Sequence, residues 1–91
     1  MEVKTFQDIL LHHGIDPKFN GYWYLIDILS AIQKDPFAAT NLSRCVYPAI
    51  CEKYCISKAG IDLALRRCIK AADIHKTPGQ FVAMLAAEIS I

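Results

Sequence analysis

The sequence lacks an apolar run as long as a membrane span. A transmembrane helix needs about 20 consecutive apolar residues, and no stretch approaches that length although 54% of the 91 residues are hydrophobic. The first residues, MEVKTFQDILLHHG, also lack the basic start and apolar middle of a signal peptide. These absences argue against a membrane protein and a secreted one, and they predict a cytoplasmic protein.

Motifs of catalysis are missing as well. The sequence has only four glycines and no glycine-rich phosphate loop, and no Ser–His–Asp or Cys–His pattern survives placement on helices. The pair His12-His13 lies near Asp8 and Asp16, but a helix C-terminus favours histidine through its dipole, so we interpret the pair as structural. We therefore expect no enzyme, no small-molecule substrate and no cofactor.

Cysteines at metal-binding spacing are also absent. No C-x-x-C pair occurs among the four cysteines, Cys45, Cys51, Cys55 and Cys68. Cys51 and Cys55 could share a metal ion with His12 or His13, but small buried thiols in a reducing cytoplasm are the interpretation we favour. The sequence therefore predicts no metal site and no disulfide.

Turn signals divide what remains into helices, and they predict an all-α single domain, residues 1–91, of five to six helices. Gly14, Asp16-Pro17 and Asp35-Pro36 separate the segments, and Ile15 is expected to fold back on the first helix. The run Tyr22-Trp23-Tyr24 could stack on bases, but on so apolar a helix we expect it in the core. Outside the central pair, the expected helices are Val3–His13, Gly21–Lys34, Phe37–Val46 and Pro78–Ile89. Asn20 is the expected N-cap of the second, and a Thr77–Gln80 capping box precedes the last. The third is expected to be interrupted near Asn41 or Ser43 and to contact the core through Phe37, Leu42, Cys45 and Val46.

The central stretch, YPAICEKYCISKAGIDLALRRCIK from Tyr47 to Lys70, is typical of a helix-turn-helix. Pro48 suits the start of a short helix that reaches Tyr54, Cys55 and Ile56 fill the turn, and Ser57 is a good N-cap. We expect the unit that would contact DNA to span about residues 47–74. For the hydroxyls of Tyr47 and Tyr54 two roles stay open, packing within the protein and contact with a phosphate of DNA.

The second helix of this pair is amphipathic. At 100° per residue its inward side holds Ile61, Ala64, Leu65, Cys68 and Ala72, with Ile69 at the margin. Its outward side holds Ala59, Asp62, Leu63, Arg66, Lys70 and Asp73, with Arg67 near the edge. Residues 44–76 carry seven basic and three acidic side chains, a net charge of +4, whereas residues 1–43 carry −2. The positive charge thus falls on the stretch that DNA binding would use, although an ordinary solvated surface is the alternative.

Four blocks in order resemble a known family: GYWYL from Gly21, LSRCVYPAICEKY from Leu42, IDLALRRCIKAA from Ile61, and TPGQFVAMLAAEI from Thr77. They resemble the C-terminal effector domain of the sporulation stage-zero master response regulator, of the sporulation initiation factor family, and the resemblance extends over roughly residues 9–89. The resemblance implies an all-helical DNA-binding domain of a transcription regulator, here without the phosphorylatable receiver domain. Met1 and the complete last helix favour a whole gene product, with an excised domain as the alternative.

The resemblance also assigns a candidate site and shows departures. Ala59, Gly60 and Leu63 stand where the family carries polar and basic side chains, and Arg67 stands for a histidine; the connection before the last helix is also shortened, to about residues 74–77. We expect Ser57–Lys70 to enter the major groove of double-stranded DNA. The candidate DNA-binding residues are Lys58, Arg66, Arg67 and Lys70 toward phosphates, Asp62 and Leu63 toward base edges, and Ser57 at the helix start.

Two points stay open. The departures fit a second hypothesis, a protein-interaction or decoy module that keeps the fold but not sequence-specific DNA reading. The last helix, with Ala83, Met84, Ala86 and Ala87 away from its apolar stripe, could be a homodimer or heterodimer face, and plain packing is the other interpretation.

Overall fold

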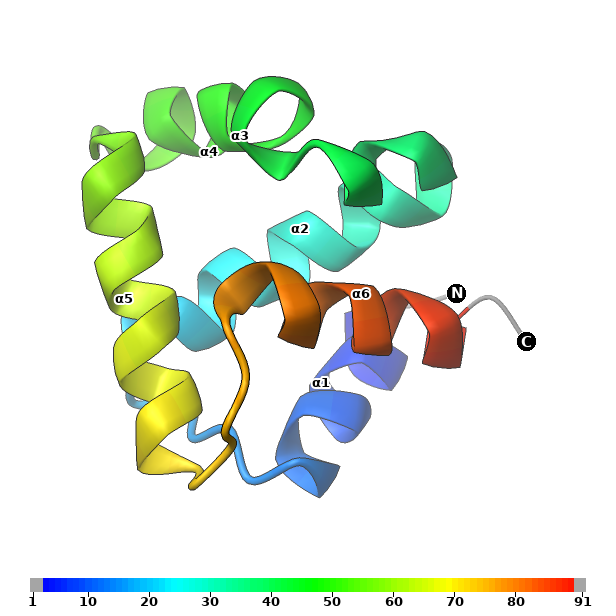
Figure 1. Ribbon diagram of the computed structural model, residues 1–91, viewed down its shortest axis with the longest axis vertical. Coiled ribbons are helices and arrows are strands. Elements are labelled where there is room, and N and C mark those ends of the chain that lie inside the picture. Colours follow the sequence, from blue (N-terminus) through cyan, green and yellow to red (C-terminus); the bar gives the residue numbers. More distant parts are fainter. Residues whose placement is uncertain (1–2, 90–91) are drawn as a thin grey trace.

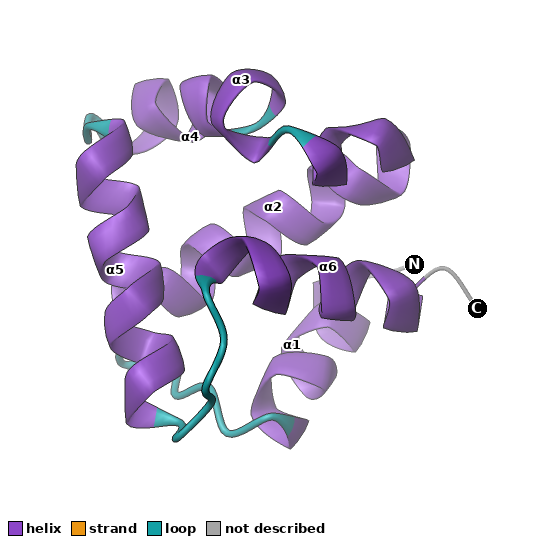
Figure 2. Cartoon of the chain, in the orientation of Figure 1, coloured by secondary structure: helices purple, strands orange, loops and turns teal. Residues whose placement is uncertain are grey.

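The computed structural model describes residues 3–89, and this part of the chain forms α-helices and one 3₁₀ helix with no strand (Figures 1 and 2). The elements are α1 (Val3–His12), α2 (Asn20–Lys34), the 3₁₀ helix η1 (Pro36–Thr40), α3 (Leu42–Cys45), α4 (Tyr47–Tyr54), α5 (Lys58–Ala71) and α6 (Pro78–Ile89). The expected all-α fold is confirmed. Within residues 3–89 no helix is both long and apolar enough to cross a membrane.

Helix α2 is the centre of the fold. It packs against α1, α4, α5, α6 and η1, and in Figure 1 it runs behind α6 with α5 at its N-terminal end. Leu25, Ile28 and Leu29 are fully buried in it, as its nearly continuous apolar sequence predicts. Tyr22 and Tyr24 are also buried, but Trp23 is 44% exposed, so the expectation of a core position was wrong for this residue. Helical periodicity turns the middle residue of the run outward.

A turn at Gly14 ends α1 as the sequence predicts, and the last helical residue is His12 instead of the expected His13. Gly14 adopts φ +83°, a left-handed conformation that glycine reaches without steric cost. Its N–H donates to the Leu11 carbonyl at 3.0 Å, and the Ile15 N–H donates to the Leu10 carbonyl at 2.9 Å. This pair of hydrogen bonds is a Schellman motif, and it places Ile15 in the core, fully buried.

The start of α2 differs from the prediction. Phe19 is the N-cap, in an extended conformation, and no side chain caps the helix. Asn20, the expected cap, is instead the first helical residue. The reason is the preceding turn: the Asp16 carboxylate accepts from the Lys18 N–H at 2.9 Å, and the Asp16 carbonyl accepts from the Phe19 N–H at 3.1 Å. That turn ends on Phe19 and leaves it as the residue that enters the helix.

The segment expected as one helix, residues 37–46, is two short pieces. The Asp35 side chain accepts from the Phe37 N–H at 3.2 Å and caps η1. Asn41, at φ −151° and ψ 64°, separates η1 from α3 and gives the expected interruption. Leu42 and Val46 are buried, but Phe37 is 81% exposed and Cys45 is exposed. The contacts expected of Phe37 and Cys45 were therefore wrong, because the tighter 3₁₀ winding and the break at Asn41 change which side faces the core.

The capping box of α6 is confirmed. The Thr77 hydroxyl accepts from the Gln80 N–H at 3.2 Å, and the Gln80 side-chain oxygen accepts from the Thr77 N–H at 3.0 Å. The predicted apolar stripe of α6 is buried, namely Phe81, Val82, Leu85 and Ile89. This stripe closes the core over α2.

Candidate nucleic-acid interface

A tight turn joins α4 to α5. Cys55 ends α4 in the left-handed region at φ 53°, and the Ile56 N–H donates to the Cys51 carbonyl at 3.1 Å. The Ser57 hydroxyl then accepts from the Gly60 N–H at 3.0 Å and caps α5, as the sequence predicts. In Figure 1, α4 lies at the top of the molecule and α5 descends from it along one edge. The α4–turn–α5 unit has the outline of a helix-turn-helix.

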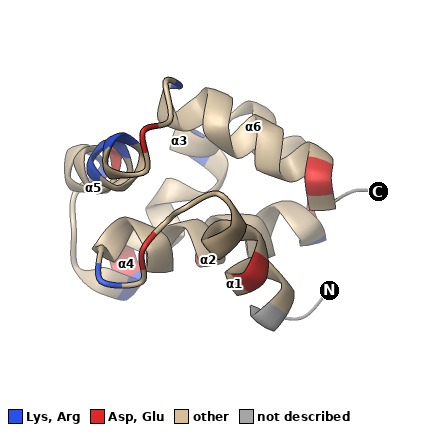
Figure 3. Cartoon of the chain, turned by 90° about the horizontal axis from the view of Figure 1, so that it is seen from below, with Lys and Arg blue, Asp and Glu red and all other residues tan. Residues whose placement is uncertain are grey.

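The two faces of α5 follow the predicted pattern. Ile61, Leu65 and Cys68 are buried, and Ile69, which was expected at the margin, is also only 2% exposed. Ala64 and Ala72 are half-buried at the border of the core. The outward side chains are exposed or, for Asp62, half-buried: Ala59, Asp62, Leu63, Arg66, Arg67 and Lys70. Figure 3 looks nearly along the axis of α5 and shows Lys and Arg positions of this helix in blue.

The start of α2 packs very closely against α5. Gly21 is buried, and a Cβ atom on it would lie 2.6 Å from the carbonyl oxygen of Ala64 and 2.7 Å from Sγ of Cys68. Separations this short do not occur between real atoms, so only glycine allows this approach. The glycine of the GYWYL block therefore fixes the depth at which α5 packs on the core.

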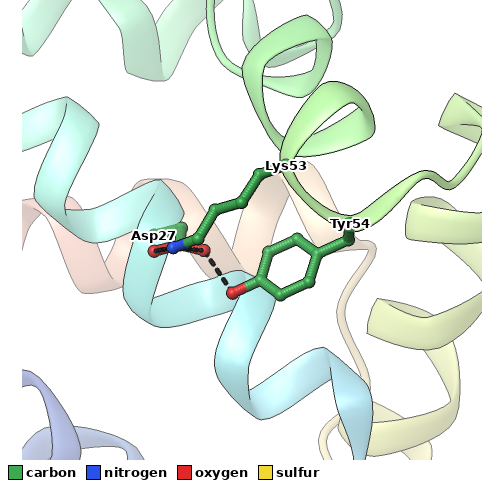
Figure 4. Close-up of polar contacts among 3 residues, drawn as sticks. All are labelled: Asp27, Lys53 and Tyr54. Atoms are coloured by element: carbon green, nitrogen blue, oxygen red, sulfur yellow. Dashed lines mark hydrogen bonds and ion pairs between the residues drawn. The ribbon is translucent and has the colours of Figure 1, made fainter.

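A polar cluster joins α4 to α2 (Figure 4). The Asp27 carboxylate accepts from Lys53 Nζ at 3.1 Å and 3.2 Å and from the Tyr54 hydroxyl at 2.6 Å. Burial, and then the hydrogen bond to Asp27, raise the pKa of the Tyr54 phenol. The hydrogen bond to Asp27 likewise raises the pKa of Lys53. Tyr54 is 37% exposed and Tyr47 is 8% exposed, so packing accounts for Tyr47 more fully than for Tyr54. A phosphate contact of either hydroxyl stays a prediction.

One flank of α5 is a groove of about 520 Å³ that α5 shares with η1, α3 and the start of α6. Lys58, Asp62 and Arg66 line it from α5, and Thr40 and Ser43 add hydroxyl groups from the opposite wall. Arg66 Nε donates to Asp62 Oδ2 at 2.7 Å, so this arginine is paired one helical turn away.

Tyr47 lies in the wall of the same groove. Burial is the main reason that the pKa of its phenol is raised; Asp62 raises it further, and Arg66 opposes that effect. The Tyr47 hydroxyl therefore stays a neutral hydrogen-bonding group at physiological pH.

A second groove, of about 430 Å³, continues the basic flank. Arg66 borders both grooves, and Lys70, His75 and Lys76 line the second one together with Asp73. Lys76 belongs to the positive stretch of the sequence, but neither it nor His75 was predicted as a site residue. The structure brings them beside α5 because the α5–α6 connection folds back along that helix (Figure 1).

The other flank of α5 is basic too. Arg67 borders a hollow of about 200 Å³ together with Lys18, Phe19, Asn20 and Ala64. Sequence reasoning missed Lys18, because it lies 49 positions before Arg67 and no local pattern joins the two. Basic side chains thus lie on both sides of the outward face that carries Leu63.

The cysteines only partly match their prediction. Cys68 is buried and Cys51 is half-buried, but Cys45 and Cys55 are exposed, so the expectation of buried thiols was wrong for these two. Cys55 ends α4 in a turn at the surface, which keeps its side chain out of the core. No group of three or more potential metal ligands occurs within residues 3–89.

His13 has a partner that the sequence did not indicate. Its Nε2 lies 2.9 Å from Oε1 of Glu88, which ties α1 to α6, and its ring meets Phe81 edge to face. The structural interpretation of this histidine fits that contact. On α6, Ala83 and Ala87 are exposed while Met84 and Ala86 are half-buried against the core, and a dimer through α6 stays a prediction.

Comparison with known protein families gives one match. Residues 6–89 match the family described as sporulation initiation factor Spo0A, C terminal. No curated protein matches the chain. The matched range covers every element of the fold except the first three residues of α1.

Proposed function

The chain belongs to the Spo0A C-terminal family, whose members are DNA-binding effector domains of response regulators, and on that premise we propose that it is itself a DNA-binding transcription regulator. In this proposal α5 enters the major groove of double-stranded DNA. The family is one of DNA-binding domains and not of enzymes. A regulator of this kind would work in the cytoplasm, as the sequence predicts.

The observation that carries the proposal is the pair of basic flanks along α5. Lys58, Arg66, Lys70 and Lys76 line one side, and Arg67 with Lys18 lines the other. A helix in the major groove lies between the phosphates of two strands, and cations on both of its sides meet them. Phosphate contacts of this kind supply position and affinity without reading sequence.

The test is fluorescence anisotropy with a random-sequence duplex at about 50 and about 200 mM salt. We expect micromolar binding that weakens steeply with salt, because each neutralised phosphate releases counterions. Arg66→Ala should weaken binding to all sequences and lower the salt slope by about one. Lys34→Ala is the charge-matched control, since Lys34 ends α2 away from α5 (Figure 1) and should leave the affinity unchanged. A folded protein that binds no duplex at the lower salt would refute the proposal.

A second candidate function rests on Leu63, which is 50% exposed in the middle of the candidate interface. A protein-interaction or decoy module would use this leucine as an anchor for a partner protein. Leu63→Glu should then abolish a protein complex and leave the fold intact. A complex that survives the substitution counts against this function.

A further inference from the structure

Most polar groups in the first two turns of α5 are already engaged. The Ser57 hydroxyl accepts from the Gly60 N–H as the helix cap, and Asp62 accepts from Arg66 at 2.7 Å. Gly60 offers no side chain, and a Cβ atom there would lie 2.7 Å from Cγ1 of Ile56. At the start of α5, one oxygen of Ser57 and one of Asp62 are thus hydrogen-bonded within the helix, and Ala59, Gly60 and Leu63 carry no side-chain donor or acceptor.

What remains outward between the basic flanks is apolar. Ala59 and Leu63 are one helical turn apart, so they share one face of α5, and both are exposed. Leu63 is the larger of the two, at 50% exposure, and Lys58 next to them lines the groove on the flank. The base-facing surface of α5 is thus a short apolar strip that centres on Leu63.

Among the four bases, thymine alone presents an apolar group, its C5-methyl, in the major groove. A leucine placed against a polar base edge would leave a desolvated donor or acceptor unpaired, which is unfavourable. We propose that Leu63 is a specificity-determining residue that selects thymine by contact with its C5-methyl group. The inference rests on the proposed DNA binding, and it names the base that such binding would prefer.

The expected size of the effect follows from the burial of one methyl group. Removing about one CH₂ equivalent from water is worth about a fourfold change in affinity. Each methyl group that Leu63 contacts should contribute about that factor, while the phosphate contacts along the flanks stay the same.

The test compares poly(dA-dT) with poly(dA-dU), two duplexes of equal charge that differ by the thymine methyl group. We expect the protein to bind the uracil duplex at least fourfold more weakly at the same salt concentration. Leu63→Ala should bind both duplexes equally, and Leu63→Met, which keeps an apolar side chain, should retain a preference for thymine. A mixed-sequence duplex copied with 5-methylcytosine adds the same methyl group at another base, and the unsubstituted protein should bind it more tightly than the cytosine form.

The outcomes separate this inference from the function on which it rests. Equal affinity of the unsubstituted protein for the thymine and uracil duplexes overturns the role of Leu63 and leaves DNA binding in place. A preference for thymine that persists in Leu63→Ala also overturns it, because another group must then read the methyl. No binding to either duplex at about 50 mM salt removes the proposed function and the inference together. Thermal unfolding of each variant shows that the fold is intact.

Discussion

Gly21 and Ala64 meet with no room for a side chain between them. A Cβ atom on Gly21 would lie 2.6 Å from the Ala64 carbonyl oxygen, which is backbone of α5 and cannot rotate away. The position of α5, the helix that is proposed to enter the major groove, is therefore set by one residue of α2.

The first prediction is that Gly21→Ala destabilises the protein. The added methyl must push α5 off α2, and overpacking of this kind lowers the free energy of unfolding by about 1–3 kcal/mol. Urea unfolding followed by circular dichroism measures it. Gly79→Ala is the matched control: nothing lies within 4 Å of a Cβ there, and the gain in helix propensity should raise stability by up to about 1 kcal/mol. Equal effects of the two substitutions would contradict the packing at Gly21.

The second prediction concerns the Asp27 cluster. Tyr54→Phe keeps the edge-to-face contact with Tyr24 and removes only the hydroxyl that donates to Asp27. The loss of this hydrogen bond should lower the free energy of unfolding by about 1 kcal/mol. Tyr54→Phe in an Asp27→Asn background should cost clearly less, because the two substitutions remove one interaction. Additive effects in this double-mutant cycle would mean that the two groups act independently.

The third prediction is that Asp62→Asn strengthens non-specific DNA binding. The carboxylate at 2.7 Å competes with phosphate for the Arg66 guanidinium, and removing its charge frees that cation. Affinity for a random-sequence duplex should rise several-fold, whereas the salt slope should change by much less than one, because Arg66 already accounts for about one phosphate contact. Asp8→Asn, an equal change of charge on the exposed side of α1, should leave both quantities nearly constant. A weaker complex for Asp62→Asn would mean that the acid itself contacts DNA.

The fourth prediction is a loss of stability in alkali. Burial raises the pKa of the Cys68 thiol from 9.0 to about 11. The unfolded thiol therefore ionises before the folded one, so this contribution is complete below pH 9 and is lost as the pH rises to about 11. The loss should reach about 2 kcal/mol. The phenols of Tyr47 and Tyr54, whose pKa values are also raised, act in the same direction at higher pH.

Cys68→Ser tests this assignment, because a hydroxyl of similar shape does not titrate and can still donate to the Leu65 carbonyl as the thiol does. Denaturant unfolding at pH 8, 9, 10 and 11 should give a visibly shallower decline for the serine variant. The comparison uses the slope with pH, since the substitution also shifts stability at every pH. Parallel declines would assign the alkaline loss to other groups with a raised pKa, namely the tyrosines and Lys53.

The sequence predicted the features that depend on local chemistry. Caps and helix ends follow from residues close together, as at Gly14, at Ser57 and at the pair Thr77 and Gln80, and each has the predicted hydrogen bonds. The inward face of α5 follows from helical periodicity alone. Asn20 failed as a cap because Asp16, four residues earlier, shapes the turn first.

What the sequence could not predict depends on approach between distant segments. The basic flank that joins Lys18 to Arg67, and the contact of Gly21 with Ala64, arise only when α2 and α5 pack together. Arg66 and Asp62 lie at a spacing that indicates a possible ion pair, but the family resemblance implied a separate contact with DNA for each of them. The proposed site residues stay a prediction, and the ion pair between two of them is seen only in the structure.

Trp23 gives the molecule a built-in optical probe. It is the single tryptophan of the chain, its ring is 44% exposed, and its indole N–H donates to the Pro17 carbonyl at 3.1 Å. Trp23 lines a surface hollow with Asn20, Tyr24 and Tyr54. Asn20 also lines the hollow of Arg67 on the flank of α5, so the two hollows are neighbours. We expect a ligand that lies along that flank to change the water around the indole, so intrinsic emission should report occupancy in real time with no dye attached.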